Sequence, residues 1–123
     1  MEKNYLNELK IAEEFLMTAK KNQNSSLRTS ANRLYFALEK AVIAYLYFKD
    51  VKVSKNHQKL WELSDSLLGK EYYSLLRDLY DLRMQADYGN ISVFADLNAK
   101  TIKENIDKVE SLISKLKLKI KNG

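Results

Sequence analysis

The fold is decided by one apolar stretch, LYFALEKAVIAYLYF, which spans residues 34–48. Only Glu39 and Lys40 carry charge within it, so a helix over these residues is apolar on nearly every side. Such a helix is either buried by neighbours on several sides or part of a subunit interface. We therefore expect a helix from about Leu27 to Lys49 to form the spine of the fold.

The segments around this helix also have a helical hydrophobic period. A first helix is predicted from about Lys3 to Lys21, and the polar stretch 22–26 both ends it and supplies a serine N-cap for the next helix. After a polar connection over residues 50–56, Asn56 can cap a short third helix. This helix spans His57–Leu68, and its expected inward-facing residues are Leu60, Trp61, Leu63, Leu67 and Leu68.

Two glycines mark the ends of the third and fourth helices. Gly69 and Gly89 stand where a left-handed residue commonly ends a helix. They delimit a fourth helix that begins at Lys70 or Glu71 and ends at Tyr88.

The last predicted helix follows a loop over residues 90–94. Asp96 or Asn98 caps it, and it runs to about Leu118, after which the lysine-rich tail is expected to fray. Its expected inner stripe is Ile102, Ile106, Val109, Ile113 and Leu116. Because short connections favour antiparallel neighbours, we predict one all-α domain over residues 1–123: an antiparallel up-and-down bundle of four long helices and one short helix.

Composition excludes several classes of site. The 123 residues include no cysteine, which excludes disulfides, thiolate metal sites and cysteine nucleophiles. The single histidine, His57, excludes metal sites built from several histidines, so we expect neither a metal nor a cofactor. The net charge of +5 is a mild bias toward polyanionic partners. A polar N-terminus and no apolar run near ~18 residues predict a cytoplasmic protein without a signal peptide or membrane span.

The segment with the strongest functional pattern contains Arg83 and Asp87, which lie four residues apart on one helical face. The base precedes the acid, which is the weaker order, and Asp87 falls in the last helical turn, where the macrodipole disfavours an anion. Residues that break local rules concentrate at functional or tertiary-structure sites. The pair is therefore either a structural ion-pair network or an anion-binding or catalytic cluster in which Arg83 holds phosphate.

Two other positions are candidates. His57 is either an acid–base group or an inert exposed residue, and an antiparallel third and fourth helix would allow it to approach Arg83. On the second helix, Arg33 and Phe36, with Tyr35 between them, either stack on and pair with a nucleotide or belong to a helix interface.

Three blocks of sequence resemble the HEPN-domain family, in particular its small stand-alone prokaryotic branch. The blocks are Ser30-x-Asn32-Arg33-Leu34-Tyr35-Phe36-Ala37, Lys55-Asn56-His57 and Leu82-Arg83-x-x-Ala86-Asp87-Tyr88-Gly89. The last is the most specific, and the order and spacing of the three cover about residues 26–115. The resemblance implies a helical bundle that forms a homodimer and often accompanies a minimal nucleotidyltransferase in toxin–antitoxin pairs.

The resemblance also implies candidate activities. Many HEPN domains are metal-independent ribonucleases with an arginine followed by a histidine, and Arg83 matches the arginine while Asp87 and Tyr88 stand where the histidine is expected. The leading hypothesis is a nucleotide- or RNA-binding module of a toxin–antitoxin or defence-type pair, with Arg83, Asp87 and Tyr88 at its centre. The alternatives are an endoribonuclease that uses His57 as base and Arg83 as phosphate clamp, and a non-catalytic dimerisation scaffold. In related pairs the partner transferase adenylylates a tyrosine after the motif, which makes Tyr88 the candidate here.

Overall fold

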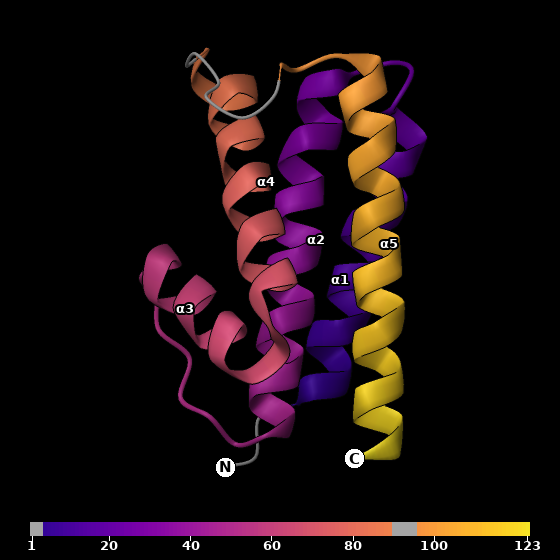
Figure 1. Ribbon diagram of the computed structural model, residues 1–123. Helices are drawn as coiled ribbons and strands as arrows, with labels where there is room; N and C mark the ends of the chain where they lie inside the picture. The colour runs from indigo at the N-terminus through magenta and orange to yellow at the C-terminus, as the bar shows by residue number, and fades with distance from the viewer. Residues whose placement is uncertain (1–3, 90–95) are drawn as a thin grey trace.

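The computed structural model of the chain describes residues 4–89 and 96–123, and within them it is all-α. The helices are α1 (Tyr5–Asn22), α2 (Leu27–Phe48), α3 (His57–Leu68), α4 (Lys70–Tyr88) and α5 (Ala99–Asn122). The four long helices run alternately up and down, and the short α3 lies across the lower half of α4 (Figure 1). The predicted antiparallel bundle of four long helices and one short helix is confirmed. The expected loop over residues 90–94 and the start of the first helix at Lys3 lie outside the described residues.

Helix α2 is the spine of the bundle, because it packs against α1, α4 and α5 (Figure 1). Leu34, Leu38, Val42 and Leu46 all have no exposed surface, so neighbouring helices of the same chain cover its apolar sides. A buried hydrogen bond also connects α2 to α1, since Ser30 Oγ donates to the Ala19 carbonyl at 2.6 Å. Burial within the chain thus accounts for the apolar character of residues 34–48.

Helix starts follow the predicted caps. The side chains of Ser26, Asn56 and Asn98 accept hydrogen bonds from the backbone amides of Thr29, Lys59 and Thr101, three residues later in each case. These bonds satisfy amides that have no partner inside the helix. Asn98, and not Asp96, is therefore the cap of α5.

Helix ends depart from expectation at three positions. Gly89 has the expected left-handed backbone, but Gly69, at φ 116° and ψ 164°, lies in a region that essentially only glycine enters, so the left-handed assignment was wrong. The end of α2 uses Asp50 at φ 56° as its left-handed residue, and Val51 N donates to the Leu46 carbonyl across it. The tail does not fray at Leu118.

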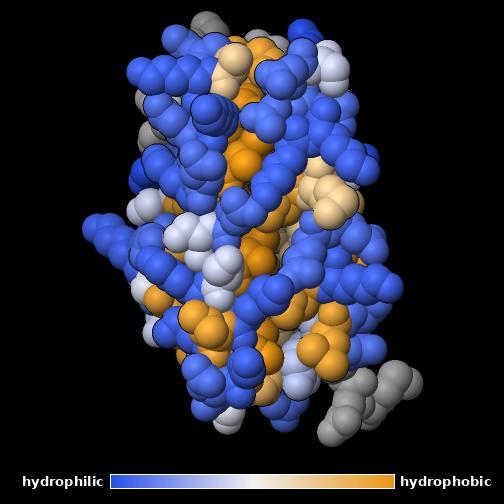
Figure 2. Space-filling view, turned by 90° about the vertical axis from the view of Figure 1, so that its right-hand side faces the viewer, coloured by the Kyte–Doolittle hydropathy of each residue, from blue (hydrophilic) through white to orange (hydrophobic). Residues whose placement is uncertain are grey.

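Burial explains the longer α5, since Ile120 is 9% exposed and keeps the last turn against the bundle. The predicted inner stripe of α5 is buried throughout, whereas Leu67 of α3 was expected inside and is 41% exposed. Hydrophilic side chains cover most of the face in Figure 2, and hydrophobic side chains are visible mainly between them. Among the described residues, no helix is both long and apolar enough to cross a membrane.

The core makes a direct prediction about Leu38. Truncation to alanine leaves a cavity between α2 and its neighbours, so Leu38→Ala should lower the free energy of unfolding by about 2–5 kcal/mol in urea denaturation. The matched control is Leu118→Ala on α5, a 58% exposed position that should change stability by no more than about 0.5 kcal/mol. Equal losses from both variants would contradict this description of the core.

Candidate functional site

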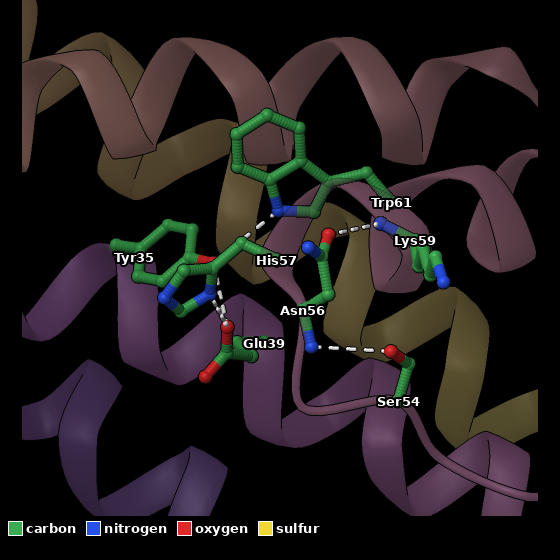
Figure 3. A network of polar contacts seen from close by, with 7 residues as sticks. All are labelled: Tyr35, Glu39, Ser54, Asn56, His57, Lys59 and Trp61. Carbon is green, nitrogen blue, oxygen red and sulfur yellow. Dashed lines mark hydrogen bonds and ion pairs between the residues drawn. The ribbon is translucent and has the colours of Figure 1, made fainter.

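A hydrogen-bonded network connects α2 to the start of α3 (Figure 3). The Tyr35 hydroxyl donates to Glu39 Oε2 at 2.5 Å and accepts from Trp61 Nε1 at 3.2 Å. His57 Nδ1 lies 3.1 Å from Glu39 Oε2 and 3.0 Å from the Tyr35 oxygen. Tyr35 and Glu39 are one helical turn apart, so a single face of α2 presents both groups to His57.

This network fixes which nitrogen of the His57 ring carries the proton. The hydrogen of the Tyr35 hydroxyl is used toward Glu39, and a carboxylate only accepts, so both neighbours of Nδ1 are acceptors. Nδ1 therefore carries the hydrogen, and the neutral ring has its lone pair on Nε2. A carboxylate that orients an imidazole in this way prepares the distal nitrogen to accept a proton.

Burial keeps the network protonated at Tyr35. The side chain has no exposed surface, and desolvation together with the hydrogen bond to Glu39 raises the pKa of Tyr35 far above its usual range. Tyr35 therefore stays a donor throughout the physiological range. It also has no direct access to a ligand, and its influence on a bound molecule passes through His57.

Arg83 of α4 lies among aromatic rings. Its guanidinium carbon is 4.8 Å from the centre of the Phe36 ring, 5.7 Å from Tyr80 and 5.9 Å from Tyr35. These cation–π contacts hold the planar group in place without using its hydrogen-bond donors. The side chain is 17% exposed.

The ion pair of Arg83 is incomplete. Nε lies 3.3 Å from Asp87 Oδ2, but the geometry is not that of a hydrogen bond, and Nε is buried. Nε makes no hydrogen bond among the described residues, and the contacts described for this guanidinium are the ion pair and the three ring contacts. A charged, prepositioned arginine with unused donors is suited to an anion.

An open pocket of about 490 Å³ joins these groups, and its lining is His57, Tyr80, Arg83, Met84 and Tyr88. The His57 and Tyr80 rings are 5.1 Å apart between centres, which places the histidine against the middle of α4. The structure thus brings three of the sequence candidates, His57, Arg83 and Tyr88, to one pocket. Tyr88 is 66% exposed at its edge.

Arg33 and Asp87 lie in a second pocket of about 420 Å³, lined by Arg28, Thr29, Asn32, Arg33, Ala86 and Asp87, whereas the sixth candidate, Tyr35, lines neither pocket. Asp87 Oδ2 accepts a hydrogen bond from Asn32 Nδ2 at 3.1 Å, and Asn32 Oδ1 accepts one from Arg33 at 2.9 Å. Arg28 also donates to the Ala86 carbonyl at the end of α4. These contacts from α2 compensate the unfavourable position of Asp87 in the last turn of its helix.

Two other hollows have different chemistry. A groove of about 480 Å³ between α4 and α5 includes Glu71, Asp78 and Asp107 in its lining, which would repel a phosphate. Another, of about 700 Å³ between α1 and α5, is largely apolar and includes the exposed Leu6 and Leu118. The described residues contain no group of three or more side chains suited to hold a metal ion. The arginine-containing pair of pockets is therefore the candidate site for an anion.

Sequence reasoning did not assign a role to Glu39, Trp61 or Tyr80. Glu39 is only 9% exposed, and the pattern that could have identified it is a carboxylate in an otherwise apolar run, one turn after a tyrosine. Trp61 was expected to face inward, and Tyr80 was not singled out. Their contacts with Tyr35 depend on how α3 packs, which the local sequence does not encode.

The network predicts unequal effects for two neighbouring tyrosines. Tyr35→Phe leaves Trp61 and Glu39 without a partner hydroxyl and should lower the free energy of unfolding by about 1–3 kcal/mol. Tyr80→Phe is the matched control, because its hydroxyl makes no hydrogen bond within the described part of the chain, and it should cost less than about 0.5 kcal/mol.

The same variants differ in alkaline solution. The folded protein holds the Tyr35 proton more tightly than the unfolded chain, whose tyrosines have a pKa of about 10. This contribution to stability is complete below that pH and is lost as pH rises above it. The free energy of unfolding, measured by denaturation at a series of pH values from about pH 9 upward, should therefore fall less steeply with pH for Tyr35→Phe than for wild type or Tyr80→Phe. Parallel curves would contradict the hydrogen-bonded state of Tyr35.

Comparison with known proteins agrees with the fold. No curated protein matches the chain. The family model described as HEPN domain matches residues 6–119, nearly the whole sequence. The match spans all three blocks that resemble this family, together with both pockets and the network behind His57. The chain therefore belongs to the HEPN family.

Proposed function

We propose that this protein is a nucleotide- or RNA-binding module that holds a phosphate at Arg83. The single observation that supports this is the guanidinium of Arg83, which is stacked on Phe36, has unused donors and lines an open pocket beside His57. Arginine binds phosphate through its planar fork of donors, and prior fixation by aromatic rings lowers the entropy lost on binding.

Asp87 limits this interaction without preventing it. Its carboxylate faces Nε of Arg83 and also accepts from Asn32, so it fixes the edge of the guanidinium that points away from the pocket ligand. The terminal nitrogens remain for phosphate. Exposed Tyr88 at the pocket edge offers a ring on which a base can stack, as aromatic residues do in single-strand binding proteins.

Replacement of Arg83 tests the binding function. Arg83→Gln should weaken binding of a fluorescent single-stranded RNA by tenfold or more, since a hydrogen bond to a charged group contributes about 1.5–3 kcal/mol. Arg77→Gln on the same helix removes an equal charge outside both pockets and should bind like wild type. If neither RNA nor nucleotide binds wild type, and Arg83→Gln only lowers stability or dimer affinity, the protein is a scaffold.

Cleavage of the bound RNA is a second candidate function, supported by the orientation of His57. With hydrogen on Nδ1, Nε2 can accept the proton of a ribose 2′-hydroxyl. The 2′-oxygen then attacks the adjacent phosphorus, the bond to the 5′-oxygen breaks, and that oxygen takes a proton from water. The products are a 2′,3′-cyclic phosphate and a 5′-hydroxyl, and Arg83 stabilises the charge that develops on phosphate.

An assay in EDTA tests this second function. Wild type should cleave single-stranded RNA, His57→Gln should lose at least about 10²-fold in rate because it lacks the general base, and Lys59→Gln on the same helix should retain it. Melting curves check that each variant is folded. Retained cleavage in His57→Gln, or none in wild type despite saturable binding, leaves the binding module as the function.

The proposed partners follow from the family. We infer a homodimer, which light scattering checks, because two copies of a HEPN ribonuclease form one cleft. A minimal nucleotidyltransferase of a toxin–antitoxin or defence-type pair is the second proposed partner. Tyr88 supports it, since its side chain is 66% exposed and accessible to a modifying enzyme. The intact mass of the chain after incubation with ATP and such a transferase tests this, with Tyr88→Phe as the control.

A further inference from the structure

We propose that the pocket lined by Arg28, Asn32, Arg33 and Asp87 is a second phosphate subsite, so that the ligand is single-stranded RNA with consecutive phosphates at Arg83 and Arg33. This inference rests on the proposed binding function and makes its ligand more specific. A mononucleotide would occupy the pocket of Arg83 alone.

Two neighbouring aromatic rings hold the two guanidinium groups. Arg83 stacks on Phe36, and the guanidinium carbon of Arg33 lies 5.4 Å from the centre of the Phe15 ring. The Phe15 and Phe36 rings are themselves neighbours, with centres 6.2 Å apart. Two cations from different helices thus stack on adjacent rings, so each loses little conformational entropy when a polyanion binds.

A chain of polar contacts joins the same two groups. Arg83 pairs with Asp87, Asp87 accepts from Asn32, and Asn32 accepts from Arg33. The two pockets therefore lie on either side of one short bridge and are not separate hollows on distant faces. Asp87 and Asn32 fix the relative positions of the arginines, which is a positioning role.

The charge of the second pocket suits an anion. Its lining carries Arg28 and Arg33 against the single carboxylate of Asp87, for a formal charge of +1. Each arginine uses one donor in a described hydrogen bond, Arg28 to the Ala86 carbonyl and Arg33 to Asn32, which leaves further donors of each fork unused. Arg28 anchors the end of α4, so Arg33 is the better candidate for phosphate.

Single-stranded RNA fits this pair of pockets better than a duplex. A flexible strand can bend to bring neighbouring phosphates to two fixed cations and still stack a base on an exposed ring such as Tyr88. The stacked bases of a duplex are unavailable to that ring. We therefore assign the site to an unpaired strand.

Salt dependence of binding tests the second subsite. The probe is a fluorescent oligouridylate of about six nucleotides with 2′-O-methyl groups, which cannot be cleaved. Each phosphate contact of a single strand contributes about 0.7 to the slope of log affinity against log salt, so Arg33→Gln should reduce the slope by about 0.7. Arg33→Lys should restore most of it, and the control Arg77→Gln should leave it unchanged.

Uridine monophosphate separates the two proposals. Arg33→Gln should bind it like wild type, whereas Arg83→Gln should lose affinity for both uridine monophosphate and the oligouridylate. Suppose that Arg83→Gln weakens the binding of both ligands, but Arg33→Gln either leaves the salt slope unchanged or weakens the binding of both ligands equally. The second subsite is then wrong, and the binding function stands. If wild type binds neither ligand, both proposals fail. Melting temperatures equal to wild type show that the Arg33 variants are folded.

Discussion

A carboxylate inside a helical bundle is costly unless donors surround it, and Glu39 is in this position at 9% exposure. Tyr35 and His57 supply the donors, and Trp61 completes the coordination of the tyrosine hydroxyl. Because α2 is otherwise apolar along this stretch, the requirement of one carboxylate determines where the start of α3 must pack. The position and tautomer of His57 both depend on it.

The site combines two ways of holding a charged or polar group. His57 is held by hydrogen bonds that consume one ring nitrogen and leave the other. Arg83 and Arg33 are held by aromatic faces, which leave the guanidinium donors unused. The difference matches the chemistry proposed for each group, since a base needs a defined lone pair and a phosphate ligand needs several donors at once.

The bundle could be predicted from the sequence because the signals that determine its helices lie within each helix or directly beside it. Hydrophobic period, asparagine and serine caps and an apolar spine determine the helices, and the antiparallel path follows from short connections. That path allowed His57 to approach Arg83, and both residues line one pocket. Glu39 and Trp61 were assigned no role because their contacts join residues 18 to 26 positions apart through the packing of α3. The unusual backbone of Gly69 and the left-handed Asp50 were missed for the same reason: tertiary packing selects them among several conformations that the local sequence allows.

Trp61 is the only tryptophan in the chain, and its indole nitrogen donates directly into the network behind His57. Its ring also lies 5.3 Å from that of Tyr80, so its fluorescence originates where α2, α3 and α4 are in contact. Emission should respond when the short helix separates from the bundle, even while the four long helices stay assembled. The protein thus contains its own optical reporter for the integrity of the pocket, without any label.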